Sequence, residues 1–146
     1  MTAIDTSRWT LFGRSDNAEF FEIEPLVLAV VPVVGCDDTE ETARQSIRIQ
    51  LEHLRKRDRG AGVLVFVDRV VTQSPGARRV YRDEPDPAYQ ACFALVGGTR
   101  LGRAVGSVFL GLQPPRVPTR LFATEADALA WARQAATDLA RGARAR

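Results

Sequence analysis

Histidine, cysteine and lysine are scarce in this sequence, and their scarcity limits the chemistry that the protein can perform. His53 is the only histidine, and Cys36 and Cys92 lie far apart, with neither a CxxC motif nor a histidine at ligand spacing. A zinc site and a serine–histidine–acid triad both require more such groups at suitable spacing. We therefore predict a protein that is not an enzyme, with no metal, no cofactor and no catalytic residue.

Long apolar runs and a strong net charge are absent as well. No stretch reaches the roughly 18 apolar residues of a membrane span, and the first residues lack the basic and apolar segments of a signal peptide. The formal net charge is +2 and Lys56 is the only lysine, so we expect no nucleic acid as a partner. We expect both cysteines to be buried, as in a reducing compartment, and predict a cytoplasmic protein.

The remaining composition is typical of one globular domain. The chain has 146 residues, of which 45% are hydrophobic and 26% charged. That is enough to bury a core without disulfides or metals. We expect the domain to cover residues 9–140, between flexible ends at 1–8 and 141–146.

Strands are predicted where β-branched and aromatic residues cluster without helical spacing. Residues 19–24 and 27–34 fit this pattern, with Pro25 near the bend between them. The runs "VLVFVD" and "YQACFALVGG" are continuously apolar, as in strands that are covered on both faces. "TRLFAT" predicts a last short strand.

Helices are predicted between these strands. One begins after Asp38, which would cap it with Glu41 as the other half of a capping box, and a short one begins after Ser74. A third covers 101–112, and Thr124 caps the last. The alternation predicts an α/β fold, with helices packed on a mixed, mostly parallel sheet of about four to five strands.

Ser74 lies in "VLVFVDRVVTQSPGARR", residues 63–79, at the start of the short helix. Because it precedes Pro75 and Gly76, its hydroxyl is placed to accept a hydrogen bond from an early backbone amide as an N-cap. A phosphate on the same hydroxyl would lie at the positive end of the helix, near Arg78 and Arg79. The pattern therefore leaves a cap and a phosphorylation site both open.

The segment "VGGTRLGRA" has the glycine spacing of a P-loop at Gly97 and Gly102. Arg103 and Ala104 replace the lysine and the hydroxyl residue that a P-loop needs. We expect no nucleotide hydrolysis there. A glycine-rich turn with solvated arginines is the favoured interpretation, and anion binding is the alternative.

Three segments together resemble a known family. "VLVFVDRVVTQSPGARR", "ACFALVGGTRLGRAVGSVFLGL" and "PTRLFATEADALAWAR" are similar to the STAS superfamily, the fold of bacterial anti-sigma-factor antagonists of the stage II sporulation AA type, and most of all to its divergent SpoIIAA-like branch. The resemblance covers about residues 19–135. It rests on the strand 94–97, the helix from Leu101, the pair Leu121-Phe122, and Ala128 with Trp131.

The resemblance implies a function as well as a fold. In these antagonists a loop after the central strand carries an Asp-Ser-Ser-Gly-like sequence whose phosphorylated serine lies at a helix N-terminus. Gln73-Ser74-Pro75-Gly76 is the matching stretch; Ser74 and Gly76 correspond, whereas the acid and the second serine do not.

We predict a regulatory module of bacterial signal transduction that binds another protein, with Ser74 as the candidate phosphorylation site; binding without phosphorylation is the alternative at this residue. Its contact residues would be Asp68, Gln73, Ser74, Gly76, Arg78, Arg79, Thr99 and Arg100. The alternative is a carrier or sensor that binds a lipid or another apolar small molecule between the sheet and helix 101–112. Its ligand would then contact Val105, Phe109 and Leu112. The sequence leaves a homodimer open.

Overall fold

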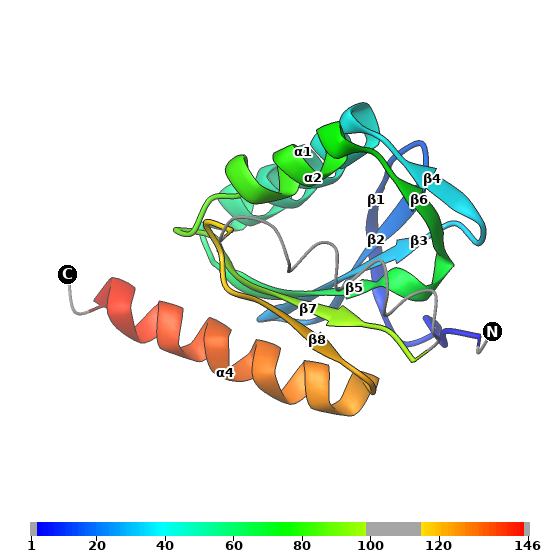
Figure 1. Ribbon diagram of the computed structural model, residues 1–146. Coiled ribbons are helices and arrows are strands. Elements are labelled where there is room, and N and C mark those ends of the chain that lie inside the picture. The colour runs from blue at the N-terminus through cyan, green and yellow to red at the C-terminus, as the bar shows by residue number, and fades with distance from the viewer. Residues whose placement is uncertain (1–2, 99–114, 145–146) are drawn as a thin grey trace.

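The computed structural model describes residues 3–98 and 115–144 and shows a three-layer α/β arrangement. Figure 1 shows that helices cover both faces of the central sheet. The first two helices are α1 (Glu40–Arg57) and α2 (Pro75–Asp83), and the helix on the opposite face is α4 (Glu125–Arg144). The predicted helix 101–112 lies outside the described residues.

The central sheet is mixed and has six strands in the order β1-β2-β3-β5-β7-β8. The first two pairings are antiparallel, and the pairings from β3 to β8 are parallel. This confirms the predicted fold class, with more strands than the expected four to five. The strands are β1 (Thr10–Arg14), β2 (Ala18–Glu24), β3 (Val27–Pro32), β5 (Ala61–Phe66), β7 (Gln90–Val96) and β8 (Thr119–Phe122).

A second, two-stranded parallel sheet pairs β4 (Cys36–Asp38) with β6 (Val70–Gln73), which follows the 3-10 turn η1 (Val67–Arg69). The sequence patterns did not predict β1, β4 or β6. β1 is an edge strand that is partly exposed along its length. β4 and β6 are short, and each forms only because the other lies beside it, which propensity does not report.

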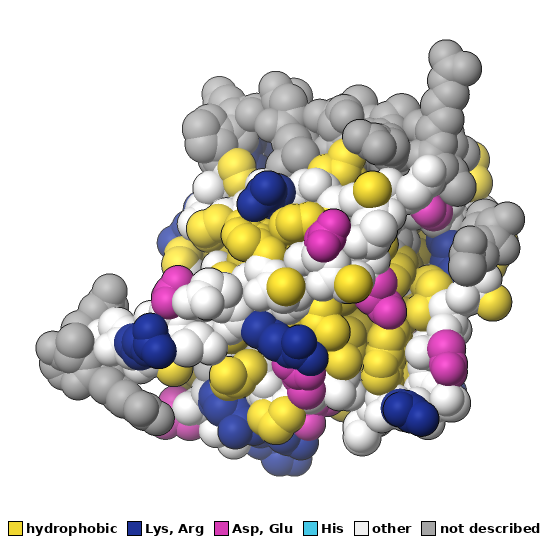
Figure 2. Space-filling model, turned by 90° about the horizontal axis from the view of Figure 1, so that it is seen from below, with side chains coloured by type: hydrophobic (Ala, Val, Ile, Leu, Met, Phe, Trp, Pro, Cys, Tyr) yellow, Lys and Arg dark blue, Asp and Glu magenta, His cyan; other side chains and the backbone are white. Residues whose placement is uncertain are grey.

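Two cores fill the spaces above and below the central sheet. On β3, Leu28 and Val30 face α1 and α2, whereas Val27 and Ala29 face α4. This alternation is the side-chain period of a strand. It explains why β3 is buried at every position. Figure 2 views the molecule from the α4 side, where hydrophobic side chains remain visible among charged ones.

The cap of α1 differs from the prediction. Thr39, not Asp38, is the N-cap residue, and its hydroxyl accepts from the backbone amide of Thr42 at 3.2 Å. The Thr42 hydroxyl accepts from the Thr39 amide at 2.8 Å and completes the capping box, so Glu41 takes no part. Asp38 is instead the last residue of β4, and it is buried. Pairing with β6 placed this carboxylate inside the fold.

The caps of α2 and α4 agree with the prediction. The Ser74 hydroxyl accepts from the Ala77 amide at 3.0 Å, with Pro75 in the first turn. The Thr124 hydroxyl accepts from the Asp127 amide at 3.2 Å.

The two cysteines are free and differ in burial. Cys92 is buried on β7, and burial raises the pKa of its thiol to about 12. Cys36 is only partly buried, contrary to expectation, because β4 lies at the margin of the fold. In the described part of the chain, no helix combines the length and apolar character that crossing a membrane requires. The predicted domain limits, 9 and 140, stay a prediction.

Candidate functional site

A small pocket lies between the central sheet and the layer formed by α1, α2 and the β4–β6 sheet. We call it the central pocket; its volume is about 60 Å³, several times what one water molecule needs. Its apolar wall includes Val30, Val65, Phe93 and Leu95 from β3, β5 and β7. Its polar lining comes mainly from the other elements and consists of Asn17, Asp38, Ser46, Gln50, Gln73 and Tyr81.

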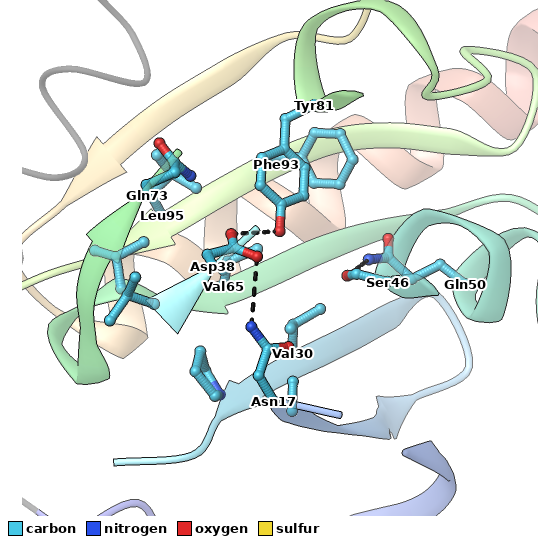
Figure 3. A pocket seen from close by; sticks show the side chains of 14 residues that line it. Asn17, Val30, Asp38, Ser46, Gln50, Val65, Gln73, Tyr81, Phe93 and Leu95 are labelled. Atoms are coloured by element: carbon cyan, nitrogen blue, oxygen red, sulfur yellow. Dashed lines mark hydrogen bonds between the residues drawn. The ribbon is translucent and has the colours of Figure 1, made fainter. Parts of the chain in front are cut away.

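Asp38 is the charged group of the central pocket, and only 6% of its surface is exposed. The Tyr81 hydroxyl donates to its Oδ2 atom at 2.6 Å, and the Thr42 hydroxyl donates to Oδ1 at 2.7 Å. Asn17 Nδ2 donates to the same Oδ1 atom at 3.4 Å. Figure 3 shows Asp38 between Tyr81 and Asn17. Three donors from three different segments therefore hold this carboxylate.

Tyr81 is held as a hydrogen-bond donor. Burial, together with the negative charge of Asp38 and the hydrogen bond to it, raises the pKa of Tyr81 well above its usual value of 10.0. The phenol therefore stays protonated at neutral pH and continues to donate to the carboxylate.

A second polar group enters the pocket from α1. Gln50 Nε2 donates to Ser46 Oγ at 3.1 Å, and Gln90 Nε2 donates to Gln50 Oε1 at 2.9 Å. The backbone amide of Asp86 donates to Gln90 Oε1 at 2.9 Å. This chain of bonds links the pocket to the turn before β7. Most polar groups this deeply buried are hydrogen-bonded in folded proteins, and this chain of bonds follows that rule.

The polar groups of the interior are concentrated at this one place. Among the residues whose burial is described, the buried polar or charged ones are Asp38, Thr42, Ser46, Gln50 and Gln90. Each of them either lines the central pocket or is hydrogen-bonded to a residue that does. An enclosed apolar wall that faces a few ordered polar groups is the usual form of a small-molecule site.

The loop around Ser74 lies next to this pocket. The Ser74 amide donates to the backbone carbonyl of Asp38 at 2.9 Å, so the loop continues the pairing of β6 with β4. Gln73 lines the pocket, and its buried Oε1 atom has no hydrogen-bond partner in the part of the chain that the structure describes.

The charges around Ser74 are already engaged. An Arg78 guanidinium nitrogen donates to the Gln73 carbonyl at 3.0 Å, and an Arg79 nitrogen lies 3.7 Å from a Glu40 carboxylate oxygen. Gly76 packs against Glu40, because a Cβ atom at this position would lie 2.9 Å from the Cβ of Glu40. A phosphate on Ser74 would therefore share this helix end with a carboxylate.

The structure places Asp68 apart from the Ser74 group. Asp68 follows β5 and accepts from the Gly98 amide at 3.0 Å. With Phe66, Arg69 and Val96 it lines a second hollow, at the carboxyl ends of β5 and β7. The predicted contact residues thus divide between two places. Thr99, Arg100, Val105, Phe109 and Leu112 lie outside the described residues.

Sequence reasoning did not identify the polar residues of the central pocket as a site. One signal was available on α1, where Ser46 and Gln50 fall on the same buried stripe as Ala43, Ile47 and Leu54. Polar residues on an otherwise apolar stripe indicate an internal hydrogen-bond partner. Asn17 and Tyr81 offered no such signal, because their contacts join segments that are distant in the sequence.

His53 lies outside the central pocket. Its ring stacks on Phe12 with the ring centroids 3.8 Å apart, and its Nε2 atom lies 3.5 Å from Glu22 Oε1. Burial lowers the pKa of His53, against the opposing effect of Glu22. Among the described residues no group of three or more His, Cys, Asp or Glu side chains is placed to hold a metal ion.

The fold and the pocket define a class: a small α/β domain with a mixed sheet and a partly polar internal site. The chain belongs to the family described as a domain of unknown function, DUF7793, whose model matches residues 31–136. No curated protein matches this chain.

A solved structure also matches. It is an uncharacterized protein of the DUF3478 family from Shewanella loihica PV-4, described as having a SpoIIAA-like fold. The match has 15% sequence identity and a TM-score of 0.48, and it covers 90% of this chain and 98% of that protein.

Proposed function

We propose that this protein is a non-catalytic module that binds a small amphipathic molecule in the central pocket. The observation that carries the proposal is the concentration of the buried polar residues around one cavity with an apolar wall. Without a ligand, these buried polar residues would add little to the stability of the fold, since apolar side chains fill a core at a lower cost in free energy. The predicted cytoplasmic location is part of the proposal.

The proposal predicts that a short neutral amphipath binds in the pocket of the purified protein. We expect 1-butanol to shift the NMR signals of the methyl groups of Val30, Val65 and Leu95, with an affinity in the millimolar range. Ala18 lines the pocket and is buried, so Ala18→Leu should fill part of the cavity and weaken binding at least about tenfold.

Ala126→Leu is the matched control, because Ala126 is exposed on α4. It adds the same atoms on the opposite side of the sheet and should leave the binding of 1-butanol unchanged. Equal binding by wild type and Ala18→Leu would show that 1-butanol binds elsewhere, and it would contradict the proposal.

A second candidate function is the docking of another protein beside the same pocket. Val33, Val34 and Val71 are 54%, 58% and 48% exposed, although they are apolar. The amide of Gly35 donates to the Arg69 carbonyl at 2.9 Å, which holds residues 33–35 next to β6. Val33, Val34 and Val71 therefore lie close together on the surface. Exposed apolar patches of this kind are typical of interaction surfaces, and Ser74 would be the control point.

Ser74 variants separate a helix cap from a charge-controlled switch. Ser74→Ala removes the acceptor for the Ala77 amide, so we expect the free energy of unfolding to fall by about 1 kcal/mol. Ser74→Asp should retain most of the stability, because a carboxylate is also a good N-cap. Chemical denaturation measures both values, with the exposed Ser7→Ala as control.

The same variants test control of docking. We expect Ser74→Asp to change the amount of partner retained by the immobilised protein, and Ser74→Ala to leave it unchanged. Equal retention by all three forms, with an unmodified intact mass for the protein from its native cells, would contradict control through Ser74 and leave this residue as a cap.

A further inference from the structure

We propose that the ligand of the central pocket is a short protonated alkylamine, with its ammonium group on Asp38 and its alkyl group on the apolar wall. This inference rests on the proposed function and specifies the chemical class of the ligand. It follows from the charge of the pocket, from its unused acceptors and from its size.

The charge of the pocket is negative, because Asp38 is the only charged side chain among its described lining residues. Asp38 takes part in none of the ion pairs formed between described residues. Its three partners, Tyr81, Thr42 and Asn17, are all neutral donors. A carboxylate removed from water is costly unless a cation accompanies it. A cationic ligand would supply the missing charge.

The pocket also offers acceptors for more than one N–H bond. A carboxylate has about four acceptor positions, and Asp38 uses three of them within the protein. Gln73 also lines this pocket, and its buried Oε1 atom has no hydrogen-bond partner among the described residues. An ammonium group carries three donors and no acceptor, which matches this set.

The size and the wall of the pocket limit the rest of the ligand. Val30, Val65 and Leu95 supply aliphatic surface, and Phe93 supplies an aromatic face. A volume of about 60 Å³ accommodates a short chain and excludes a long acyl tail. The combination fits a small amine and does not fit a lipid.

Three isosteric probes test the charge preference of the full chain. n-Butylamine, 1-butanol and butyrate have nearly the same shape and differ in charge. We expect n-butylamine to bind wild type at least about tenfold more tightly than 1-butanol, and butyrate to bind more weakly than either. The pocket methyl signals in NMR titrations report all three affinities at neutral pH.

Asp38→Asn tests the residue that carries the inference. The amide keeps the shape of the side chain and removes its charge, so n-butylamine should lose its advantage while 1-butanol still binds. Asp37→Asn is the matched control, because Asp37 is the exposed neighbour on β4, and it should leave the preference intact. If Asp38→Asn does not fold, the comparison of the three probes on wild type still decides the inference.

The possible results separate this inference from the proposed function. Equal or tighter binding of 1-butanol by wild type would overturn the amine inference and leave the proposed function standing. Tightest binding of butyrate would also overturn it, since the pocket would then favour an anion. Failure of all three probes to shift the pocket methyl signals would overturn both.

Discussion

Replacing Gly62 with alanine is expected to destabilise the protein by about 2–3 kcal/mol, because α4 leaves no space for a side chain there. A Cβ atom on Gly62 would lie 2.6 Å from the carbonyl oxygen of Ala132 and 2.9 Å from its Cα atom. These are backbone atoms of a helix packed on β5, so the contact cannot be relieved by a rotamer change. The helix would have to move away from the sheet.

The same substitution on α4 provides a control with the opposite sign. Gly142 lies in α4, and a Cβ atom there would have no neighbour within 4 Å. Gly142→Ala should stabilise the protein by about 0.5–1 kcal/mol, since alanine favours a helix over glycine. Thermal and urea unfolding measure both changes. A Gly62→Ala variant as stable as wild type would contradict the close approach of α4 to β5.

Removal of the Asp38 carboxylate is expected to have the second large effect. In Asp38→Ala the hydroxyls of Tyr81 and Thr42 lose their hydrogen bonds to the carboxylate, and the loss of a buried hydrogen bond to a charged group costs about 1–3 kcal/mol. We expect a total loss of about 2–4 kcal/mol in the free energy of unfolding. Asp37→Ala, on the exposed neighbour, should cost less than about 1 kcal/mol.

A double-mutant cycle isolates the bond between Asp38 and Tyr81. Tyr81→Phe alone should cost about 1–2 kcal/mol, because it removes a donor from a buried carboxylate. In the Asp38→Ala background the same change should cost less, since the acceptor is already gone. Additive losses would show that the two side chains do not depend on one another and would contradict the geometry of the pocket.

The contact between Asp38 and Tyr81 also predicts how the stability of the protein depends on pH. The pKa of Tyr81 is raised in the folded protein relative to about 10 in the unfolded chain. The folded state therefore keeps this proton at a pH where the unfolded state has lost it, and stability falls as the pH rises above that value. Wild type should lose more stability than Tyr81→Phe between neutral pH and about pH 11.

Much of the architecture could be read from local patterns. The runs that became β5 and β7 are apolar because both of their faces are covered. In half-buried strands and helices, apolar residues recur with the period of the strand or of the helix, which also shows in the sequence. The caps at Ser74 and Thr124 were predictable because a cap is made by neighbours within three residues. These features need only short segments of the chain.

The short sheet and the true place of Asp38 could not be read in this way. Before a helix an aspartate is a common cap, and only the pairing of β4 with β6 moved that role to Thr39 and turned the carboxylate inward. Asp68 and Ser74 are six positions apart in the sequence, but β6 lies between them. Asp68 lines the second hollow, whereas Gln73, the neighbour of Ser74, lines the central pocket.

The sequence by itself determined the α/β class, the buried strands and the helix that begins at Ser74, because burial and capping leave local patterns. Only the tertiary structure decided where the polar interior lies. Asn17 precedes β2, and the other polar residues of the pocket lie in four further elements: Asp38 in β4, Gln50 in α1, Gln73 in β6 and Tyr81 in α2. No local pattern links them. A site assembled from distant segments exists only once the layers have packed together.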